Sequence, residues 1–168
     1  SPLARIRLLV EMIPKHKNQK KLISEIVFLD GMISNLLLSD KLSIPYSNLE
    51  CENIKVDYLV IKVLDLIGLG ADRVKFNNLI PGVLCKLDET KMIIAIRNII
   101  DNALKYSFDN ENVDVTVNRE GKWLFFAIKN VGQKINPEEK DDIFKPFFRS
   151  KNNKSNISGF GLGLTICQ

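Results

Sequence analysis

The stretch RNIIDNALKYS, residues 97–107, places amide and ammonium groups on a helix that is otherwise largely apolar. Asn98 and Asn102 lie four residues apart and share one helical face, and Lys105 follows three residues later beside them. An amide oxygen can bind Mg²⁺ without adding charge, and a lysine can bind a phosphate. The stripe indicates a site for a metal and a phosphate, and the alternative is an ordinary solvent-exposed face.

This helix is predicted to run from Glu89 to about Tyr106. Asp88 is suited to cap its start, and the apolar residues that follow keep the helical period. Those apolar residues are Met92, Ile93, Ile96, Ile99, Ile100, Ala103 and Leu104. The helix therefore has one face for a core and another for the polar stripe.

Three further segments follow the helix: IKNVGQKI (128–135) at the end of a strand, DDIFKPFFRS (141–150) and SGFGLGLTIC (158–167). Gly159, Gly161 and Gly163 precede a predicted helix. Glycines let a backbone approach phosphates, and the free N–H groups of a helix start favour an anion. One glycine pattern is weak evidence, but the four segments in this order and at these spacings are strong evidence together.

The stretch from Phe144 to Ser158 contains four cationic residues and no acidic one. We expect it to lie over phosphates and to become ordered around a nucleotide. Phe144, Phe147 and Phe148 are expected to anchor the start of this stretch by packing on the domain.

The segments between residues 56 and 168 alternate strand and helix patterns, which predicts a two-layer α/β domain. Val113, Val115 and Val117 alternate with polar residues, as in a half-buried strand. The other elements are predicted to be a helix over Val56–Ile67, strands over Arg73–Asn77, Val83–Leu87 and Trp123–Lys129, a helix start at Asn136-Pro137 with Asn136 as N-cap, and a helix from Gly161 onward. The last of these strands pairs back on its predecessor as a hairpin.

Residues 1–40 have the pattern of two helices joined by a polar turn. Apolar residues recur with steps of three and four in each helix, which is the seam of a coiled coil. The first seam consists of Leu3, Ile6, Val10 and Ile13, and the second of Leu22, Ile26, Leu29, Ile33 and Leu36. Such a hairpin is half of a four-helix bundle, so we expect a homodimer through residues 1–39. The alternative is a hairpin packed on its own chain. Residues 41–55 are interpreted as a linker.

Composition excludes several classes of protein. The chain has 168 residues, and 24 Lys+Arg against 20 Asp+Glu give a net charge of +4, too small and scattered for nucleic-acid binding. The longest apolar run, Trp123–Ile128, is far shorter than the roughly 20 residues of a membrane span. Cys51, Cys85 and Cys167 are odd in number and widely spaced, which argues against a disulfide framework and for a reducing compartment.

The four segments resemble those of the bacterial sensor histidine kinases of two-component systems. RNIIDNALKYS resembles the asparagine box of that family, KNVGQKI its first glycine box, DIFKPFFR its phenylalanine box and GFGLGL its second glycine box. The opening SPLARIRLLVEM resembles the stretch that follows the phosphoacceptor histidine. The resemblance covers the whole chain. It implies an α+β fold in which the helical hairpin precedes a two-layer α/β sandwich of the histidine kinase and GHKL ATPase type.

The resemblance also implies an enzyme that binds ATP with Mg²⁺ and transfers the γ-phosphoryl group to a histidine and then to an aspartate of a response regulator. Asn102 would hold the metal. The nucleotide site implied by the boxes consists of Asn98, Asn102, Lys105, Tyr106, Asn130, Gly132, Ile135, Phe144, Arg149, Gly159, Gly161, Leu162, Gly163 and Leu164. The phosphoacceptor is expected four residues before Ser1, and the chain is expected to be the cytoplasmic portion of a membrane-anchored protein.

Other features of the sequence bear on this function. His16 is followed by Lys-Asn, where the family has an acidic residue after its phosphoacceptor, and is interpreted as a surface residue. Ser1 falls where the family has a polar residue that positions water for dephosphorylating the regulator. Asn130 replaces the usual aspartate, but its amide can still pair with adenine. Lys134 replaces the second glycine of the first glycine box. These departures leave a degenerate or phosphatase-biased module with weak nucleotide binding as an alternative.

A GHKL-type ATPase that hydrolyses ATP is less favoured. Such enzymes place a glutamate four residues before the metal-binding asparagine, as a general base for water. That position is Asn98 here, and an amide cannot act as a base. Asp101 is adjacent to Asn102 in sequence and therefore points from a different helical face.

Overall fold

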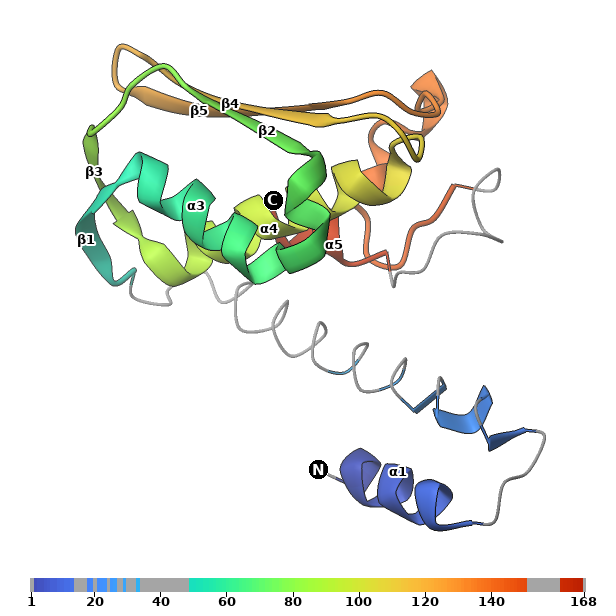
Figure 1. Cartoon of the computed structure of the whole chain (residues 1–168). Coiled ribbons are helices and arrows are strands. Elements are labelled where there is room, and N and C mark those ends of the chain that lie inside the picture. Colours follow the sequence, from blue (N-terminus) through green and yellow to red (C-terminus); the bar gives the residue numbers. More distant parts are fainter. Residues whose placement is uncertain are drawn as a thin grey trace. The chain divides into compact units, whose positions relative to one another are not determined.

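The computed structural model describes residues 2–13, 18–19, 21–23, 25–26, 29, 33, 49–150 and 161–167. The chain divides into two compact units, residues 1–45 and residues 46–168 (Figure 1). Among the described residues, no helix combines the length and the apolar character needed to cross a membrane.

The first unit begins with helix α1 (Pro2–Met12), which ends two residues before Pro14. The side chain of Gln19 reaches back to this helix, because its Nε2 donates to the carbonyl oxygens of Val10 at 2.8 Å and Ile13 at 3.3 Å. Residues 21–23, 25–26, 29 and 33 are again helical. The hairpin over residues 1–40 stays a prediction, and His16 and Ser1 lie outside the described residues.

The apolar seams of the first unit stay largely open within one chain. Ile26 is 8% exposed, but five other seam residues are 44–50% exposed: Ile6, Ile13, Leu22, Leu29 and Ile33. Leu8 and Leu9, which widen the apolar face, are more exposed still. A single copy of this unit thus leaves much apolar surface in contact with water.

The second unit contains all the remaining elements. Its strands are β1 (Cys51–Lys55), β2 (Val74–Asn78), β3 (Leu84–Asp88), β4 (Val113–Glu120) and β5 (Trp123–Asn130). Its α-helices are α3 (Val56–Ile67), α4 (Glu89–Tyr106) and α5 (Gly163–Ile166), and its 3-10 helices are η1 (Gly68–Arg73), η2 (Pro137–Glu139) and η3 (Asp142–Phe144).

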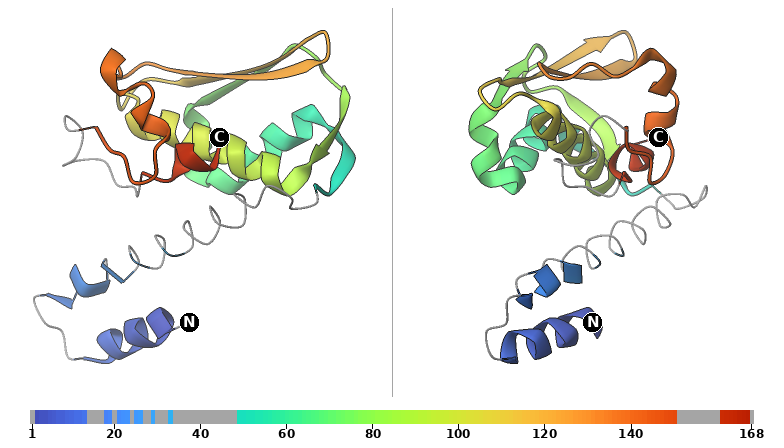
Figure 2. Two further views of the ribbon diagram at one scale, coloured as in Figure 1. Left: turned by 180° about the vertical axis from the view of Figure 1, so that it is seen from behind. Right: turned by 90° about the vertical axis from the view of Figure 1, so that its right-hand side faces the viewer.

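Two sheets organise this unit. β2, β4 and β5 form a three-stranded sheet in that order, with β2 parallel and β5 antiparallel to β4. β1 and β3 form a separate antiparallel pair. Helices α3 and α4 pack against each other and cover one face of the three-stranded sheet (Figures 1 and 2). The predicted two-layer α/β fold is therefore confirmed.

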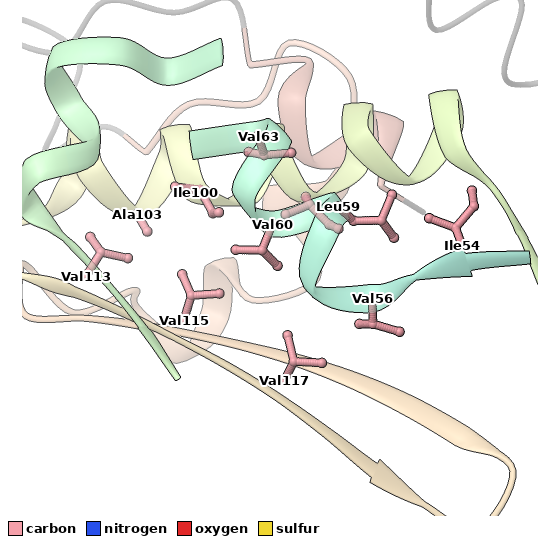
Figure 3. Close-up of a cluster of buried hydrophobic side chains, with 11 residues drawn as sticks. Ile54, Val56, Leu59, Val60, Val63, Ile100, Ala103, Val113, Val115 and Val117 are labelled. Carbon is pink, nitrogen blue, oxygen red and sulfur yellow. The ribbon is translucent and has the colours of Figure 1, made fainter. Parts of the chain in front are cut away.

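The core lies between the sheet and the two helices (Figure 3). Val113, Val115 and Val117 are fully buried on one face of β4, as their alternation predicts. The helices supply Val56, Leu59, Val60, Val63, Ile96, Ile100 and Ala103, and β1 supplies Ile54. Burying one such aliphatic side chain contributes about 1.5–3 kcal/mol, so this cluster fixes how α4 sits on the sheet.

The start of α4 is held by two polar contacts. The Asp88 side chain accepts a hydrogen bond from the Lys91 N–H at 3.0 Å, which confirms the predicted cap. Glu89 forms an ion pair with Lys62 of α3. The hydrogen bond from Lys62 holds the pKa of Glu89 below its usual value. The first turn of α4 is thereby tied to α3.

Three expectations need correction. The interpreted linker 41–55 does not extend to residue 55, because residues 51–55 form β1, which pairs with β3 and buries Ile54. Asn136 makes no side-chain cap, and the helix after it is the single short turn η2. The last helix begins at Gly163, not Gly161, because Gly161 adopts a φ of +70°.

Candidate functional site

The polar stripe of α4 faces the start of α5. A methyl group on Gly163 would lie 3.3 Å from Asn98 Oδ1 and 3.5 Å from Asn102 Nδ2, so this glycine rests against both amides. Asn98 Nδ2 donates to the carbonyl of Ile94 at 3.0 Å, which leaves its oxygen for the side facing α5. Both asparagines are half-buried. The structure thus brings Asn98, Asn102 and Gly163 together.

Helix α5 is fixed in place by its neighbours on both sides. Leu162 is only 2% exposed. Thr165 Oγ1 donates to the Phe144 carbonyl at 2.9 Å, and Cys167 Sγ donates to the Ala95 carbonyl at 3.5 Å. Burial raises the pKa of the Cys167 thiol to about 11, so it stays protonated and keeps its donor. α5 therefore links the segment that contains Phe144 to α4. Leu164, another residue of the predicted site, lies within α5.

Gly161 and Phe147 form a close backbone contact that closes the loop between them. The Phe147 N–H donates to the Gly161 carbonyl at 2.8 Å. Both residues have left-handed backbone, with φ of +70° at Gly161 and +64° at Phe147. A Cβ at position 161 would lie 2.6 Å from the Phe148 carbonyl oxygen. Only glycine fits there, which explains one of the three glycines of the motif.

The first glycine box meets the other end of α4. A Cβ on Gly132 would lie 1.9 Å from the Tyr106 carbonyl oxygen, an overlap that excludes any side chain. Ser107 and Gly132 form an isolated antiparallel bridge, and the Phe108 N–H donates to the Val131 carbonyl at 3.0 Å. Asn130 Nδ2 lies 3.2 Å from the same Cβ position. Asn130, Gly132 and Tyr106 are therefore neighbours.

The other residues of the predicted site differ in exposure. Lys105 is exposed in the last turn of α4, Tyr106 is 36% exposed and Ile135 is 52% exposed. Arg149 is half-buried and has a partner. Gly159 lies outside the described residues, as does most of the basic stretch.

The expectations for the start of the basic stretch are partly wrong. Phe147 is 52% exposed and Phe144 39% exposed, so neither is packed away in the domain. Lys145 Nζ lies 2.5 Å from Asp142 Oδ1, and that hydrogen bond raises the pKa of Lys145. Its charge is therefore partly compensated by an acidic residue just outside the stretch.

Two cavities of this unit lie away from these residues. One of about 510 Å³ opens on the outer face of the three-stranded sheet, around Asn77, Thr116 and Lys129. A second of about 320 Å³ lies between β3 and the β4–β5 hairpin. The candidate site, which we call the rim, is the face of α4 that contacts Gly163 and Gly132, and it lines neither of these cavities.

A metal ion at this rim would depend on amide oxygens. Within the described part of the chain, no group of three or more His, Cys, Asp or Glu side chains is arranged to hold a metal. Mg²⁺ commonly takes one or two protein oxygens and completes its shell with water and substrate phosphates. The half-buried amide of Asn102 fits that role, because α5 brings a glycine-rich backbone beside it.

Comparisons with known proteins agree with this geometry. Residues 87–168 match the family described as histidine kinase-, DNA gyrase B-, and HSP90-like ATPase. The sensor histidine kinase CpxA of Escherichia coli is 28% identical over 177 aligned residues, covering all of this chain and 38% of that protein. The chain therefore spans well under half the length of this curated relative.

Two solved structures share the fold. The Acinetobacter baumannii histidine kinase AdeS has a TM-score of 0.70 and 20% identity, covering 97% of this chain and 78% of that one. Full-length ShkA, solved in complex with AMPPNP, has a TM-score of 0.71 and 19% identity, covering 96% and 35%.

Residues 87–168, which include α4 and both glycine-rich segments, therefore carry an ATPase domain of the histidine kinase, DNA gyrase B and HSP90 type. All of this chain aligns with part of CpxA, and its second unit is a catalytic domain of the bacterial sensor histidine kinase type.

Sequence reasoning missed several residues that hold this rim. Ser107 ends α4 by donating from Oγ to the Ala103 carbonyl at 2.7 Å, and Thr165 joins α5 to Phe144. Arg73 hydrogen bonds the loop after α4 from a distant part of the chain. Ser107 and Thr165 lie within motif segments and could have been flagged there. No sequence pattern singles out Arg73.

Proposed function

We propose that this chain binds Mg²⁺ and ATP along the rim of α4 and transfers the γ-phosphoryl group to a histidine of the helical hairpin, and then to an aspartate of a response regulator. The observation that supports this best is the double contact of α4. The helix meets Gly163 through Asn98 and Asn102, and it meets Gly132 through the Tyr106 carbonyl. Helix α4 would thus hold the phosphates at one end, beside Gly163, and the base at the other end, beside Gly132.

At the phosphate end, the Asn102 amide oxygen would hold Mg²⁺, which would offset part of the triphosphate charge. Lys105 is exposed and free to turn toward a phosphate, and the glycines near α5 allow close approach of the backbone. Phosphoryl transfer relies mainly on positioning and electrostatics. These groups are sufficient for that role without a strong base.

At the base end, the Asn130 amide would read adenine. Its oxygen can accept from the exocyclic amino group, and its NH₂ can donate to the neighbouring ring nitrogen. Asn130 is exposed beside Gly132, so the amide is accessible to a base. The resemblance further implies Ile135, Phe144 and Arg149 as contacts for the nucleotide.

Transfer to a protein side chain is favoured over hydrolysis. The position of the general base in the hydrolytic relatives is Asn98, whose amide is hydrogen bonded and contacts Gly163. Asp101 instead pairs with Arg97 along the helix, with 3.7 Å between Oδ2 and Nε. Neither residue can activate water at the rim.

The first unit would supply dimerisation through residues 1–39. Its seam residues are largely exposed in one chain, and a second hairpin would cover them as a four-helix bundle. By resemblance, the chain would be the cytoplasmic portion of a longer membrane-anchored kinase. Ser1 would occupy the position that assists dephosphorylation of the regulator.

The deciding experiment removes the metal ligand. Asn102→Ala should abolish the Mg²⁺-dependent part of ADP binding while the fold is retained, because alanine lacks the amide oxygen that would hold the metal. Loss of a hydrogen-bonding group toward a charged ligand corresponds to about 2–3 kcal/mol of binding free energy. Calorimetry with ADP, with and without Mg²⁺, measures this directly.

Asn53→Ala is the matched control, since it removes an exposed amide from β1, outside the rim. It should bind Mg²⁺ and ADP as the wild type does. Equal affinity of the Asn102→Ala variant and the control would place the metal elsewhere and would favour a degenerate signalling module.

A further inference from the structure

Arg73 joins two segments that are distant in sequence. It ends η1, directly before β2, and lies outside the four motif segments and outside the range matched by the ATPase family. Its Nη2 donates to the carbonyl oxygens of Phe108 at 2.8 Å and Glu111 at 3.0 Å, and its Nε donates to Glu111 at 3.2 Å. One guanidinium thus binds two carbonyls of the loop that follows α4.

That loop is in direct contact with the proposed base-recognition segment. The Phe108 N–H donates to the Val131 carbonyl at 3.0 Å, and the Phe108 carbonyl also accepts from the Glu111 N–H at 3.0 Å. The residue before Phe108, Ser107, forms the bridge to Gly132. Phe108 therefore connects Arg73 on one side to residues 131–132 on the other.

The chemistry of this contact suits arginine in particular. A guanidinium is planar, always charged, and presents several N–H groups in a fixed fork. Hydrogen bonds from a charged donor are shorter and stronger than neutral ones. A lysine has one ammonium group and cannot hold two carbonyls of a loop in the same fixed arrangement.

We propose that Arg73 is a positioning residue for nucleotide-base recognition: it fixes the Phe108–Glu111 loop, and through the Phe108–Val131 hydrogen bond it fixes the segment containing Asn130 and Gly132. This inference rests on the proposed nucleotide function of that segment. Among the described residues, the side-chain hydrogen bonds of Arg73 go to Phe108 and Glu111, so its effect should be confined to the base.

The test compares Arg73→Ala and Arg73→Lys with the wild type in the full chain. Arg73→Ala should weaken Mg²⁺–ADP binding about tenfold, the loss expected for hydrogen bonds from a charged donor. It should also narrow the preference for ATP over GTP, measured by competition. Arg73→Lys should recover only part of the ADP affinity and of the preference for ATP over GTP, because lysine keeps the charge but lacks the planar, forked set of N–H groups.

Arg119→Ala is the control. Arg119 also donates from Nε to a backbone carbonyl, that of Gly121 at 2.9 Å, but at the β4–β5 turn. It should leave affinity and base preference unchanged. If Arg73→Ala behaves as Arg119→Ala does, or if Arg73→Lys recovers fully, the positioning role is wrong. A loss of affinity with unchanged base preference would likewise reject it, because general destabilisation does not select between bases.

A second measurement separates this inference from the proposed function. If the wild-type chain binds no nucleotide, the proposed function fails, and the amide resonances of Val131 and Gly132 then test Arg73 alone. Their displacement in Arg73→Ala, but not in Arg119→Ala, would support the mechanical link. Unmoved resonances would overturn it.

Discussion

The two ends of α4 are built from different kinds of contact. At the proposed phosphate end, the side chains of Asn98 and Asn102 face Gly163, where an added Cβ would lie 3.3 Å from Asn98 Oδ1 and 3.5 Å from Asn102 Nδ2. At the base end, backbone meets backbone, because Gly132 lies against the Tyr106 carbonyl and Val131 pairs with Phe108. The proposed phosphate end is thus formed by the half-buried amides of Asn98 and Asn102. The proposed base end is formed by a close backbone contact whose neighbouring side chains are exposed.

This difference sets how each end responds to change. A side-chain contact can give by a few tenths of an ångström through rotation, whereas a backbone junction between a helix end and a strand end cannot shift without moving both elements. We therefore expect the base end to be intolerant of added volume and the phosphate end to be adjustable.

Gly132→Ala is expected to have the largest effect. Its Cβ would lie 1.9 Å from the Tyr106 carbonyl oxygen, so α4 and the end of β5 must separate. Overpacking of this kind lowers the free energy of unfolding by about 1–3 kcal/mol. Urea denaturation should show that loss, and calorimetry should show that ADP binding is lost with it.

Gly121→Ala separates this clash from backbone strain. Its φ is +58° and its Cβ would meet open space, so it should lower the free energy of unfolding by about 1–2 kcal/mol and leave ADP binding intact. If Gly132→Ala also kept its ADP affinity, the backbone junction would not define the base end.

Substitutions of Asn130 should have an intermediate effect. Asn130→Leu leaves the adenine amino group without a partner, and we expect about tenfold weaker ATP binding and a reduced preference for ATP over GTP. Asn130→Asp adds a charged acceptor at an exposed position and should stay within about tenfold of the wild type, in the direction of tighter binding.

Competition between ATP and GTP is the measurement for both Asn130 variants. Unaltered affinity and unaltered base preference in Asn130→Leu would show that this segment does not read the base, and the difference between the two ends of α4 would lose its functional meaning.

Gly163→Ala should have the smallest effect. Its methyl group would lie 3.3 Å from Asn98 Oδ1 and 3.5 Å from Asn102 Nδ2, and both side chains can adjust. The free energy of unfolding should not fall, since alanine favours a helix over glycine. Binding of ADP should weaken about threefold, and only when Mg²⁺ is present, because the amides shift slightly. A large loss of ADP affinity in the absence of Mg²⁺ would contradict the expectation that the side chains at the phosphate end can adjust.

The local patterns of the sequence predicted the parts of the fold that depend on neighbours in the chain. The Asp88 cap, the extent of α4 and the buried valines of β4 are all fixed by short-range period and capping. The resemblance assigned Asn102 and Gly163 to one nucleotide site, and the structure brings these two residues close together.

The remaining features depend on partners far along the chain, which short patterns do not show. CENIK has a single buried residue, Ile54, and becomes a strand only because β3 pairs with it. The left-handed φ of Phe147 arises from its contact with Gly161, and no phenylalanine would be predicted to adopt it. The role of Arg73 depends on where a distant loop passes.

The strand pairings of the second unit have a consequence for how it unfolds. Along the chain the strands run β1, β2, β3, β4, yet β1 pairs with β3 and β2 pairs with β4. Each pairing thus closes a loop that contains one member of the other pair. Neither sheet is a contiguous segment of chain, because the segment that spans one pair always contains a strand of the other pair. We therefore expect the unit to unfold as one cooperative block rather than sheet by sheet.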